Sequence, residues 1–203
     1  EVEVKDGKNV YKQRYEKGNI KTELEVIGTT DESGTVVTFK PDPTIFTDTT
    51  RYDYDTLLLR LREQAFLNGG IRIVLKDMRT DADIPEREGG IRSYVEYLLE
   101  KSKKDRLNNK VIYISGSDKD SMAEIALIWS TSYDTKIMSF ANTIHTVDGG
   151  THESSFKTSL ARVVNKYGRN FKFLKDNDSN LKSDDINEGL IAVVSVKLTD
   201  AQF

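Results

Sequence analysis

The stretch Asp148–Phe171, DGGTHESSFKTSLARVVNKYGRNF, carries the longest helical pattern in this sequence of 203 residues. It opens with a glycine pair, after which apolar residues recur every three or four positions: Phe156, Leu160, Val163, Val164, Tyr167 and Phe171. This spacing predicts an amphipathic helix whose apolar stripe packs on the rest of the fold. Two interpretations of Gly149-Gly150 remain open, because a glycine pair before a helix suits a tight turn or a site for an anion such as phosphate.

A basic stripe follows the same predicted helix. Arg162, Lys166 and Arg169 are spaced by four and three positions, and Lys157 stands at their flank. Such a stripe is usually the solvated face of an amphipathic helix. Contact with the phosphates of DNA is the second interpretation, since lysine and arginine neutralise phosphate charge.

The two histidines do not form a recognisable metal site. His145 and His152 lie seven positions apart, whereas a helical metal pair needs a spacing of four. His152 is expected to be an early helical residue that the backbone satisfies. The sequence contains neither a P-loop nor a G-x-G-x-x-G pattern, and no base is identified beside Ser154 or Ser155.

Composition limits the possible partners. Lys and Arg number 30 against 33 Asp and Glu, a net charge of -3, so any contact with nucleic acid must come from a local patch. The sequence has no cysteine, which excludes a disulfide framework and fits a reducing compartment. No apolar run approaches the roughly 20 residues that cross a bilayer. We therefore expect a cytoplasmic protein without membrane contact.

The rest of the chain is predicted to alternate short strands and helices. Strands are expected at residues 2–4, 10–15, 24–26, 36–39, 71–75, 111–114, 122–130, 136–142 and 190–194. Helices are expected at residues 54–68, at 91–101 and briefly after Ser183.

Two of these expectations concern how strands are arranged. Residues 122–130 and 136–142 are expected to pair around a turn at Ser132–Asp134, and the apolar run 190–194 is expected to be a central strand buried on both faces. The alternation predicts two small α+β units. A strand that begins at Glu1 indicates a piece of a longer protein.

Several segments along the whole chain stand in the same order as in a known family. They are Ser33–Asp42, Phe46–Thr50, Tyr52–Tyr54, Arg60–Asn68, Gly89–Ile91, Tyr94–Leu98, Phe140–Ile144, Gly149–His152, Phe156–Lys157 and Glu188–Lys197. Together they resemble the B subunits of bacterial DNA gyrase, a type IIA topoisomerase. The B subunit of topoisomerase IV shares the pattern, but the Arg60–Asn68 segment is more similar to gyrase.

The resemblance implies a fold and a set of partners. Residues 1–88 would be the C-terminal part of a GHKL ATPase sandwich, and residues 89–203 a transducer domain similar to domain 2 of ribosomal protein S5. In this family ATP and Mg²⁺ close two B subunits around DNA, in an A2B2 assembly with the gyrase A subunit. The transducer relays the nucleotide state to the DNA-cleaving core.

The same resemblance assigns candidate site residues. Thr35 would lie beside the adenine of ATP with Gly34, and Val37 would be either a pocket wall or sheet core. Lys157 would face the passing DNA. The basic stripe of the same predicted helix adds Arg162 and Lys166 as candidate DNA contacts.

The family's catalytic residues have no counterparts in this sequence. Its Mg²⁺-binding asparagine, its general-base glutamate and its phosphate-sensing lysine fall outside these 203 residues. We therefore expect no catalytic residue, no metal site, no tight ATP or Mg²⁺ binding and no ATP hydrolysis by the chain alone.

One alternative and one further expectation remain. The alternative is a non-catalytic interaction or nucleic-acid-binding α+β module that does not use ATP. The polar connection Thr80–Arg87 departs from the family, which usually has aromatic residues there. Because half of a GHKL sandwich would expose apolar sheet surface, weak self-association of the chain is also expected.

Overall fold

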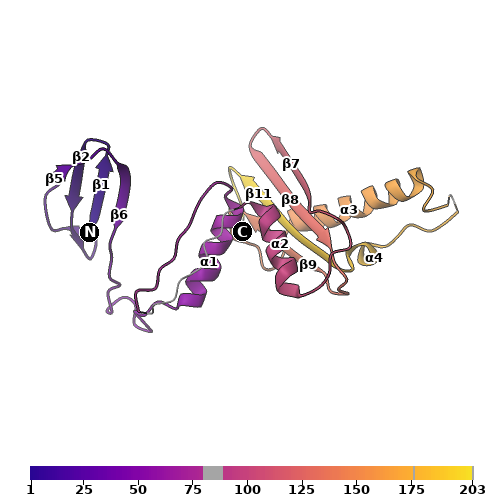
Figure 1. The fold of residues 1–203 in the computed structure, drawn as a ribbon, viewed down its shortest axis with the longest axis horizontal. Helices are drawn as coiled ribbons and strands as arrows, with labels where there is room; N and C mark the ends of the chain where they lie inside the picture. The colour runs from indigo at the N-terminus through magenta and orange to yellow at the C-terminus, as the bar shows by residue number, and fades with distance from the viewer. Residues whose placement is uncertain (80–88, 176, 203) are drawn as a thin grey trace. The chain divides into compact units, whose positions relative to one another are not determined.

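The chain forms two compact units, Glu1–Asp53 and Tyr54–Phe203 (Figure 1). The prediction of two α+β units is wrong for the first, because residues 1–53 form strands and no helix, whereas the second unit has both helices and strands. The computed structural model describes residues 1–79, 89–175 and 177–202. The expected division into residues 1–88 and 89–203 differs from this boundary, because the helix that begins at Tyr54 belongs to the second unit. Residue 88 and the polar connection Thr80–Arg87 lie outside the described residues, so the domain division stays a prediction.

The first unit is built on a four-stranded antiparallel sheet. Its spatial order is β5-β2-β1-β6, with β1 at Val2–Asp6, β2 at Asn9–Gln13, β5 at Glu25–Thr29 and β6 at Ser33–Val37. A separate two-stranded ribbon consists of β3 (Tyr15–Glu16) and β4 (Asn19–Ile20). The strands predicted at residues 2–4 and 10–15 form and pair as a hairpin, β1 with β2. In its turn Gly7 has a φ of 86°, and the Asp6 carboxylate accepts the backbone N–H groups of Lys8 and Asn9.

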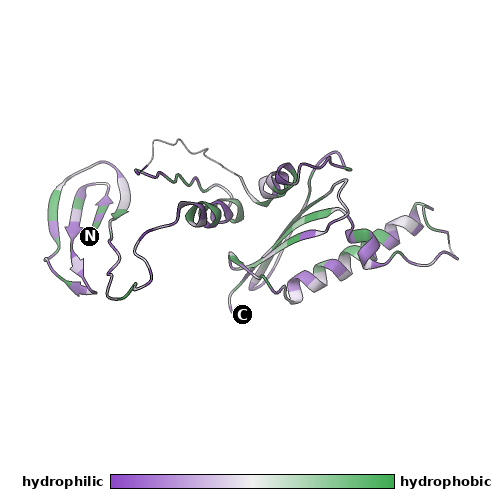
Figure 2. Ribbon diagram, turned by 90° about the horizontal axis from the view of Figure 1, so that it is seen from below, coloured by the Kyte–Doolittle hydropathy of each residue, from purple (hydrophilic) through white to green (hydrophobic). Residues whose placement is uncertain are grey.

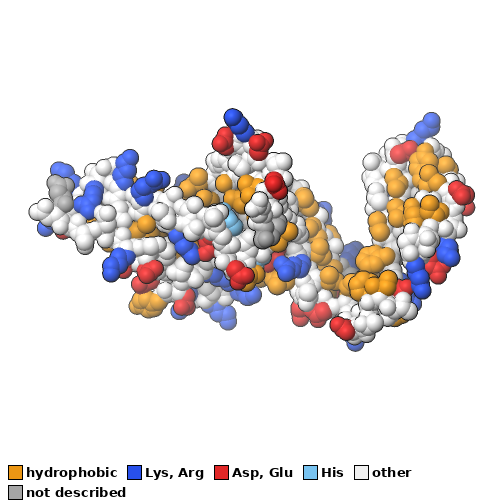
Figure 3. All heavy atoms as spheres, turned by 180° about the vertical axis from the view of Figure 1, so that it is seen from behind, with side chains coloured by type: hydrophobic (Ala, Val, Ile, Leu, Met, Phe, Trp, Pro, Cys, Tyr) orange, Lys and Arg blue, Asp and Glu red, His pale blue; other side chains and the backbone are white. Residues whose placement is uncertain are grey.

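One face of this sheet is apolar and open within the unit. Val4 pairs with Tyr11 and Thr35, and Val2 pairs with Val37, which places these side chains on one face. Val37 is 62% exposed. Apolar side chains gather on the surface of this unit (Figure 3). The expected self-association stays a prediction. Its physical basis is this exposed apolar face, which a second copy of the chain could cover.

The second unit is a five-stranded sheet with helices on both faces (Figures 1 and 2). The strands are β7 (Ile112–Asp118), β8 (Ser121–Trp129), β9 (Lys136–Ala141), β10 (Ile144–His145) and β11 (Leu190–Leu198). The helices are α1 (Tyr54–Leu67), α2 (Ile91–Ser102), α3 (Thr151–Asn170) and α4 (Ser183–Asn187). Within the described ranges, no helix combines the length and apolarity required to cross a membrane.

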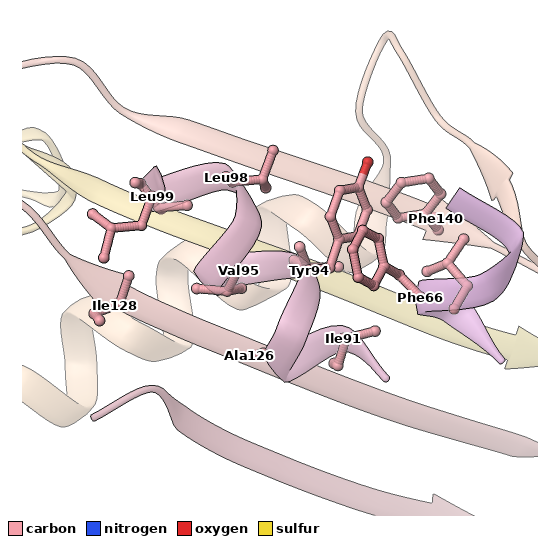
Figure 4. Close-up of a cluster of buried hydrophobic side chains, with 12 residues drawn as sticks. Phe66, Ile91, Tyr94, Val95, Leu98, Leu99, Ala126, Ile128 and Phe140 are labelled. Carbon is pink, nitrogen blue, oxygen red and sulfur yellow. The ribbon is translucent and has the colours of Figure 1, made fainter. Parts of the chain in front are cut away.

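The central strand β11 supplies residues to two separate cores. Ile191 and Val193 join the cluster under α2 and the end of α1, with Phe66, Tyr94 and Phe140 (Figure 4). The alternate residues of β11 join the cluster under α3: Leu190, Ala192 and Val194. Continuous apolarity is required where both faces of a strand are covered, so the prediction of a buried central strand is confirmed.

The predicted pairing of residues 122–130 with 136–142 is wrong. The spatial order is β10-β9-β11-β8-β7, so β11 lies between the two expected partners. It is antiparallel to β8 and parallel to β9. The physical reason is that α3 crosses over the sheet between β9 and β11, which returns the chain in the same direction.

The strand expected at residues 71–75 does not form. Only Ile73 has a bridge position there, and Ile71 and Val74 are about half exposed. The alternation of apolar residues therefore occurs without a continuous neighbouring strand among the described residues.

The apolar stripe of α3 packs on the sheet only in its first half. Phe156 is 7% exposed and joins the core with Leu160, whereas Val163, Tyr167 and Phe171 are each more than half exposed. Figure 1 shows α3 extending past the end of the strands. The expectation that the whole stripe packs is correct only for the residues that lie over the sheet.

Candidate functional site

Lys157 is held in place by an ion pair on its own helix. Its Nζ donates to Glu153 Oε1 at 2.6 Å, one helical turn earlier. The other carboxylate oxygen, Oε2, accepts the hydroxyl of Ser139 at 2.6 Å. Ser139 lies on β9 and is 1% exposed, so the carboxylate joins α3 to the interior of the sheet.

Two further side chains complete what we call the Ser139 network: Ser139, Thr146, His152, Glu153 and Lys157. Thr146 Oγ1 lies 2.9 Å from Ser139 Oγ and 3.1 Å from His152 Nε2. It also donates to the backbone oxygen of Ser139 at 2.9 Å. The expectation that the backbone satisfies His152 is wrong, because a side-chain hydroxyl contacts its ring.

The charge of Glu153 follows from its surroundings. Partial burial alone would raise the pKa of this carboxyl group, but hydrogen bonds from Lys157 and Ser139 and the nearby lysine charge outweigh it. The net result is a pKa below the ordinary value of 4.5. Glu153 is therefore a carboxylate at neutral pH.

The Gly149-Gly150 pair forms a tight turn before α3. The φ values are 78° and 156°, and a Cβ at Gly150 would lie 2.8 Å from the His152 ring. The Gly149 N–H already donates to the backbone oxygen of Thr146 at 2.9 Å. Glu153 also places a negative charge in the first turn of the helix. The geometry favours the tight-turn interpretation over an anion site.

The structure does not bring the three predicted DNA-contact residues together. Lys157 and Lys166 are nine positions apart, which at about 100° per residue is about two and a half turns, so they point to opposite sides of α3. Arg162 and Lys166 are exposed on the solvent side, whereas Lys157 lies beside Glu153. Lys157 therefore lies apart from the predicted stripe, whose members Arg162 and Lys166 share the solvent side of the helix.

Arg169, the last member of that stripe, has a structural role. Its guanidinium donates to the backbone oxygens of Lys175 and Asp178, both at 2.9 Å, and to Asn180 Oδ1 at 2.8 Å. These bonds fasten the segment after α3 to the helix. Arg169 is therefore engaged within the chain.

The predicted nucleotide contacts lie on the edge strand β6 of the first unit. Thr35 pairs with Val4 and Val37 with Val2, so both side chains lie on the apolar face, whereas Gly34 pairs with Lys5 on the other face. Because Val37 is exposed, the alternative that it is sheet core is wrong for this chain. A cavity of about 710 Å³ in this unit is lined by Glu1 and residues 14–18 and 38–43, and by none of the three.

Metal ligands do not gather in the described parts of the chain. Within residues 1–79, 89–175 and 177–202, no group of three or more His, Asp or Glu side chains could hold a metal ion. The expectation of no metal site in this chain stays a prediction.

Sequence reasoning missed most of the Ser139 network. Glu153 could have been found, because an acidic residue four positions before a lysine forms an ion pair on a helix. Ser139 and Thr146 carry no such signal, since they come from β9 and from the turn after β10. Only the folded sheet places their hydroxyls beside α3.

The chain resembles known proteins along its whole length. Residues 90–203 match the family model described as DNA gyrase B. The full chain is 52% identical to the DNA gyrase B protein of Clostridium acetobutylicum, and 98% of it is 49% identical to that of Enterococcus faecalis. It spans 32% and 31% of these curated relatives, about a third of their length.

Solved structures also resemble this chain over its whole length. The 43K ATPase domain of Thermus thermophilus gyrase B, in complex with an aminocoumarin, matches with a TM-score of 0.88 and 34% identity, over 100% of this chain and 55% of that one. The topoisomerase IV ATP-binding domain of Francisella tularensis, in complex with a small-molecule inhibitor, has a TM-score of 0.73 and 24% identity, over 100% and 54%. The second likeness shows the fold alone.

Proposed function

This chain belongs to the DNA gyrase B family, and from that membership we propose that it works within the ATPase subunit of a type II DNA topoisomerase. The observation that carries the proposal is the agreement of both sequence and fold with gyrase B over the whole chain. In the intact protein, ATP binding and hydrolysis would drive the passage of one DNA duplex through another. The chain would couple the two events.

The two parts of the chain would share this work. We assign residues 1–88 to the C-terminal part of a GHKL ATPase sandwich and residues 89–203 to a transducer similar to domain 2 of ribosomal protein S5. The partners would be DNA, the gyrase A subunit in an A2B2 assembly and, once ATP binds, a second copy of gyrase B. Such an assembly would work in the bacterial cytoplasm.

The chain's own residues suit contact with the base of ATP. Thr35 and Val37 lie on one face of β6, a hydroxyl next to an apolar side chain. A hydroxyl hydrogen-bonds the polar edge of a base, and an apolar side chain covers its flat face. Gly34 would contribute backbone only. ATP with Mg²⁺ supplies the energy for the reaction when it binds the intact protein.

The isolated chain is expected to show no ATP turnover above background. The resemblance places the family's Mg²⁺ ligand, general base and phosphate-sensing lysine outside these 203 residues, and positioning with charge stabilisation is what phosphoryl transfer requires. A phosphate-release assay with ATP and Mg²⁺ measures this, with the full-length protein as the positive control. Turnover by the chain alone would contradict the expectation.

Lys157→Ala in the full-length protein tests the proposed DNA contact. One charge-assisted hydrogen bond to phosphate is worth about 1.5–3 kcal/mol, so the DNA concentration for half-maximal stimulation of ATP hydrolysis should rise about tenfold or more. The slope of log affinity against log salt should fall by about 0.9. Lys101→Ala is the matched control, an exposed lysine in the last turn of α2. An unchanged DNA response in Lys157→Ala would remove the contact.

The two other assignments have weaker support. The topoisomerase IV assignment has the shared fold in its favour, whereas the relatives quoted above are gyrase proteins. A module that does not use ATP would leave the match to a gyrase ATPase domain unexplained.

A further inference from the structure

We infer that Glu153 is a positioning residue for Lys157, which fixes where the lysine ammonium meets the phosphate backbone of DNA. The inference rests on the proposed function, because it concerns how the DNA contact of that function is made. Its basis is the arrangement of three side chains: Ser139 on β9, and Glu153 and Lys157 on α3.

The carboxylate of Glu153 is held at both oxygens. Oε2 accepts the Ser139 hydroxyl and Oε1 accepts the Lys157 ammonium, each at 2.6 Å. Ser139 is buried and stands opposite Val194 of the central strand, so it is fixed in the sheet. The Glu153 side chain, only 17% exposed, therefore has one defined position.

Lys157 keeps the capacity to bind a second group. An ammonium has three N–H donors, and one of them goes to Glu153. The lysine side chain is 38% exposed, so the remaining donors can reach a ligand that approaches α3. A long flexible side chain loses rotamer entropy when a ligand orders it. Glu153 orders Lys157 beforehand, which lowers the free-energy cost of binding phosphate.

Arg162 and Lys166 provide the internal comparison on the same helix. Both are exposed, and the described residues give neither of them an ion pair. They can attract DNA as flexible charges, but nothing fixes the direction of their donors. Lys157 is therefore oriented before DNA binds, whereas Arg162 and Lys166 are not.

A carboxylate beside a phosphate site can also act in the opposite direction. Its charge repels phosphate and competes for the lysine. These two effects predict opposite changes when the charge of Glu153 is removed, and the positioning role predicts weaker binding. The sign of the change therefore decides between them.

The test uses the full-length protein in the assembled enzyme, with linear duplex DNA as the probe. The measured quantity is the DNA concentration that gives half-maximal stimulation of ATP hydrolysis. Glu153→Gln keeps the shape and removes the charge. It should raise this concentration about threefold, and should cause no further change in a Lys157→Ala background. Glu96→Gln, an exposed position on α2, is the matched control and should have no effect.

Ser139→Ala provides a second, independent variant. It leaves the charge of Glu153 in place but frees the carboxylate from β9, so it should raise the half-maximal DNA concentration about twofold, again only when Lys157 is present. If Glu153→Gln destabilises the protein, this variant still tests the positioning role.

Three results would overturn the inference, and they are distinguishable. Tighter DNA binding by Glu153→Gln would show competition instead of positioning. An equal loss with and without Lys157 would show that Glu153 acts through the fold. If Lys157→Ala itself leaves the DNA response unchanged, the DNA contact of the proposed function fails, and the inference fails with it.

Discussion

Gly189→Ala is expected to lower the free energy of unfolding of the second unit by about 3 kcal/mol or more. Gly189 joins α4 to β11 at a φ of 72°, and a non-glycine residue in this region costs about 1–2 kcal/mol. A Cβ there would also overlap the backbone oxygen of Ser130 and lie 2.7 Å from that of Ser132. Displacing packed backbone adds about 1–3 kcal/mol.

The backbone at Gly189 cannot shift to relieve this overlap without losing hydrogen bonds. Its carbonyl accepts the Ser130 N–H at 2.8 Å and the Ser130 hydroxyl at 3.0 Å. Calorimetry should show a melting temperature lower by about 10 °C for a unit of this size. Gly116→Ala is the matched control, because a Cβ on this β7 residue meets no atom within 4 Å. Equal melting temperatures for the two variants would contradict the account.

Phe66→Ala is expected to destabilise the second unit by about 3–5 kcal/mol, the usual cost of removing a buried phenyl ring. Phe66 is 2% exposed and stacks on Tyr94 with ring centroids 4.7 Å apart. Together with Leu67 it places the end of α1 in the same buried cluster as the apolar face of α2. Hydrogen exchange of the backbone amides of α1 should accelerate with the loss of stability.

Leu59→Ala on the same helix is the control for this prediction. Leu59 is 49% exposed, so its truncation should change stability by less than about 1 kcal/mol. The comparison also tests where the compact units divide. If α1 belonged with residues 1–53, removing the Phe66 ring would leave the unfolding of the five-stranded sheet in the second unit unchanged.

Elements with a clear period could be predicted from the sequence. The stripes of α1, α2 and α3 and the apolar run of β11 depend on local spacing, and all four elements form. Which strands lie side by side was not predictable in the same way, because alternation says nothing about a neighbour. One signal could have corrected the β8–β9 pairing. A strand, a long helix and a fully apolar strand in succession are typical of a parallel crossover.

The residues of the candidate site also differ in whether local spacing in the sequence predicts their contacts. Lys157 and its neighbour Glu153 belong to one helix, so simple angular arithmetic gives their pairing and also separates them from Lys166. Ser139 lies on a different element, β9. No local sequence pattern predicts its contact with Glu153, which is 14 positions away. Sequence reasoning therefore reached the cation but not the group that fixes the carboxylate.

The place of β11 in the sheet also sets the order in which the second unit can be assembled. β7 and β8 are adjacent in sequence and can form a hairpin early, whereas β9 has no ladder with β8. The strand that joins them is the last of the five to leave the ribosome. Nascent chains fold from the N-terminal side. The strand pairs β7–β8 and β9–β10 can therefore join into one sheet only after residues 190–198 have been synthesised. The sheet of the second unit is thus completed only when this late segment is present. Its contacts with β8 and β9 are distant in sequence, and such long-range contacts make a topology slow to fold.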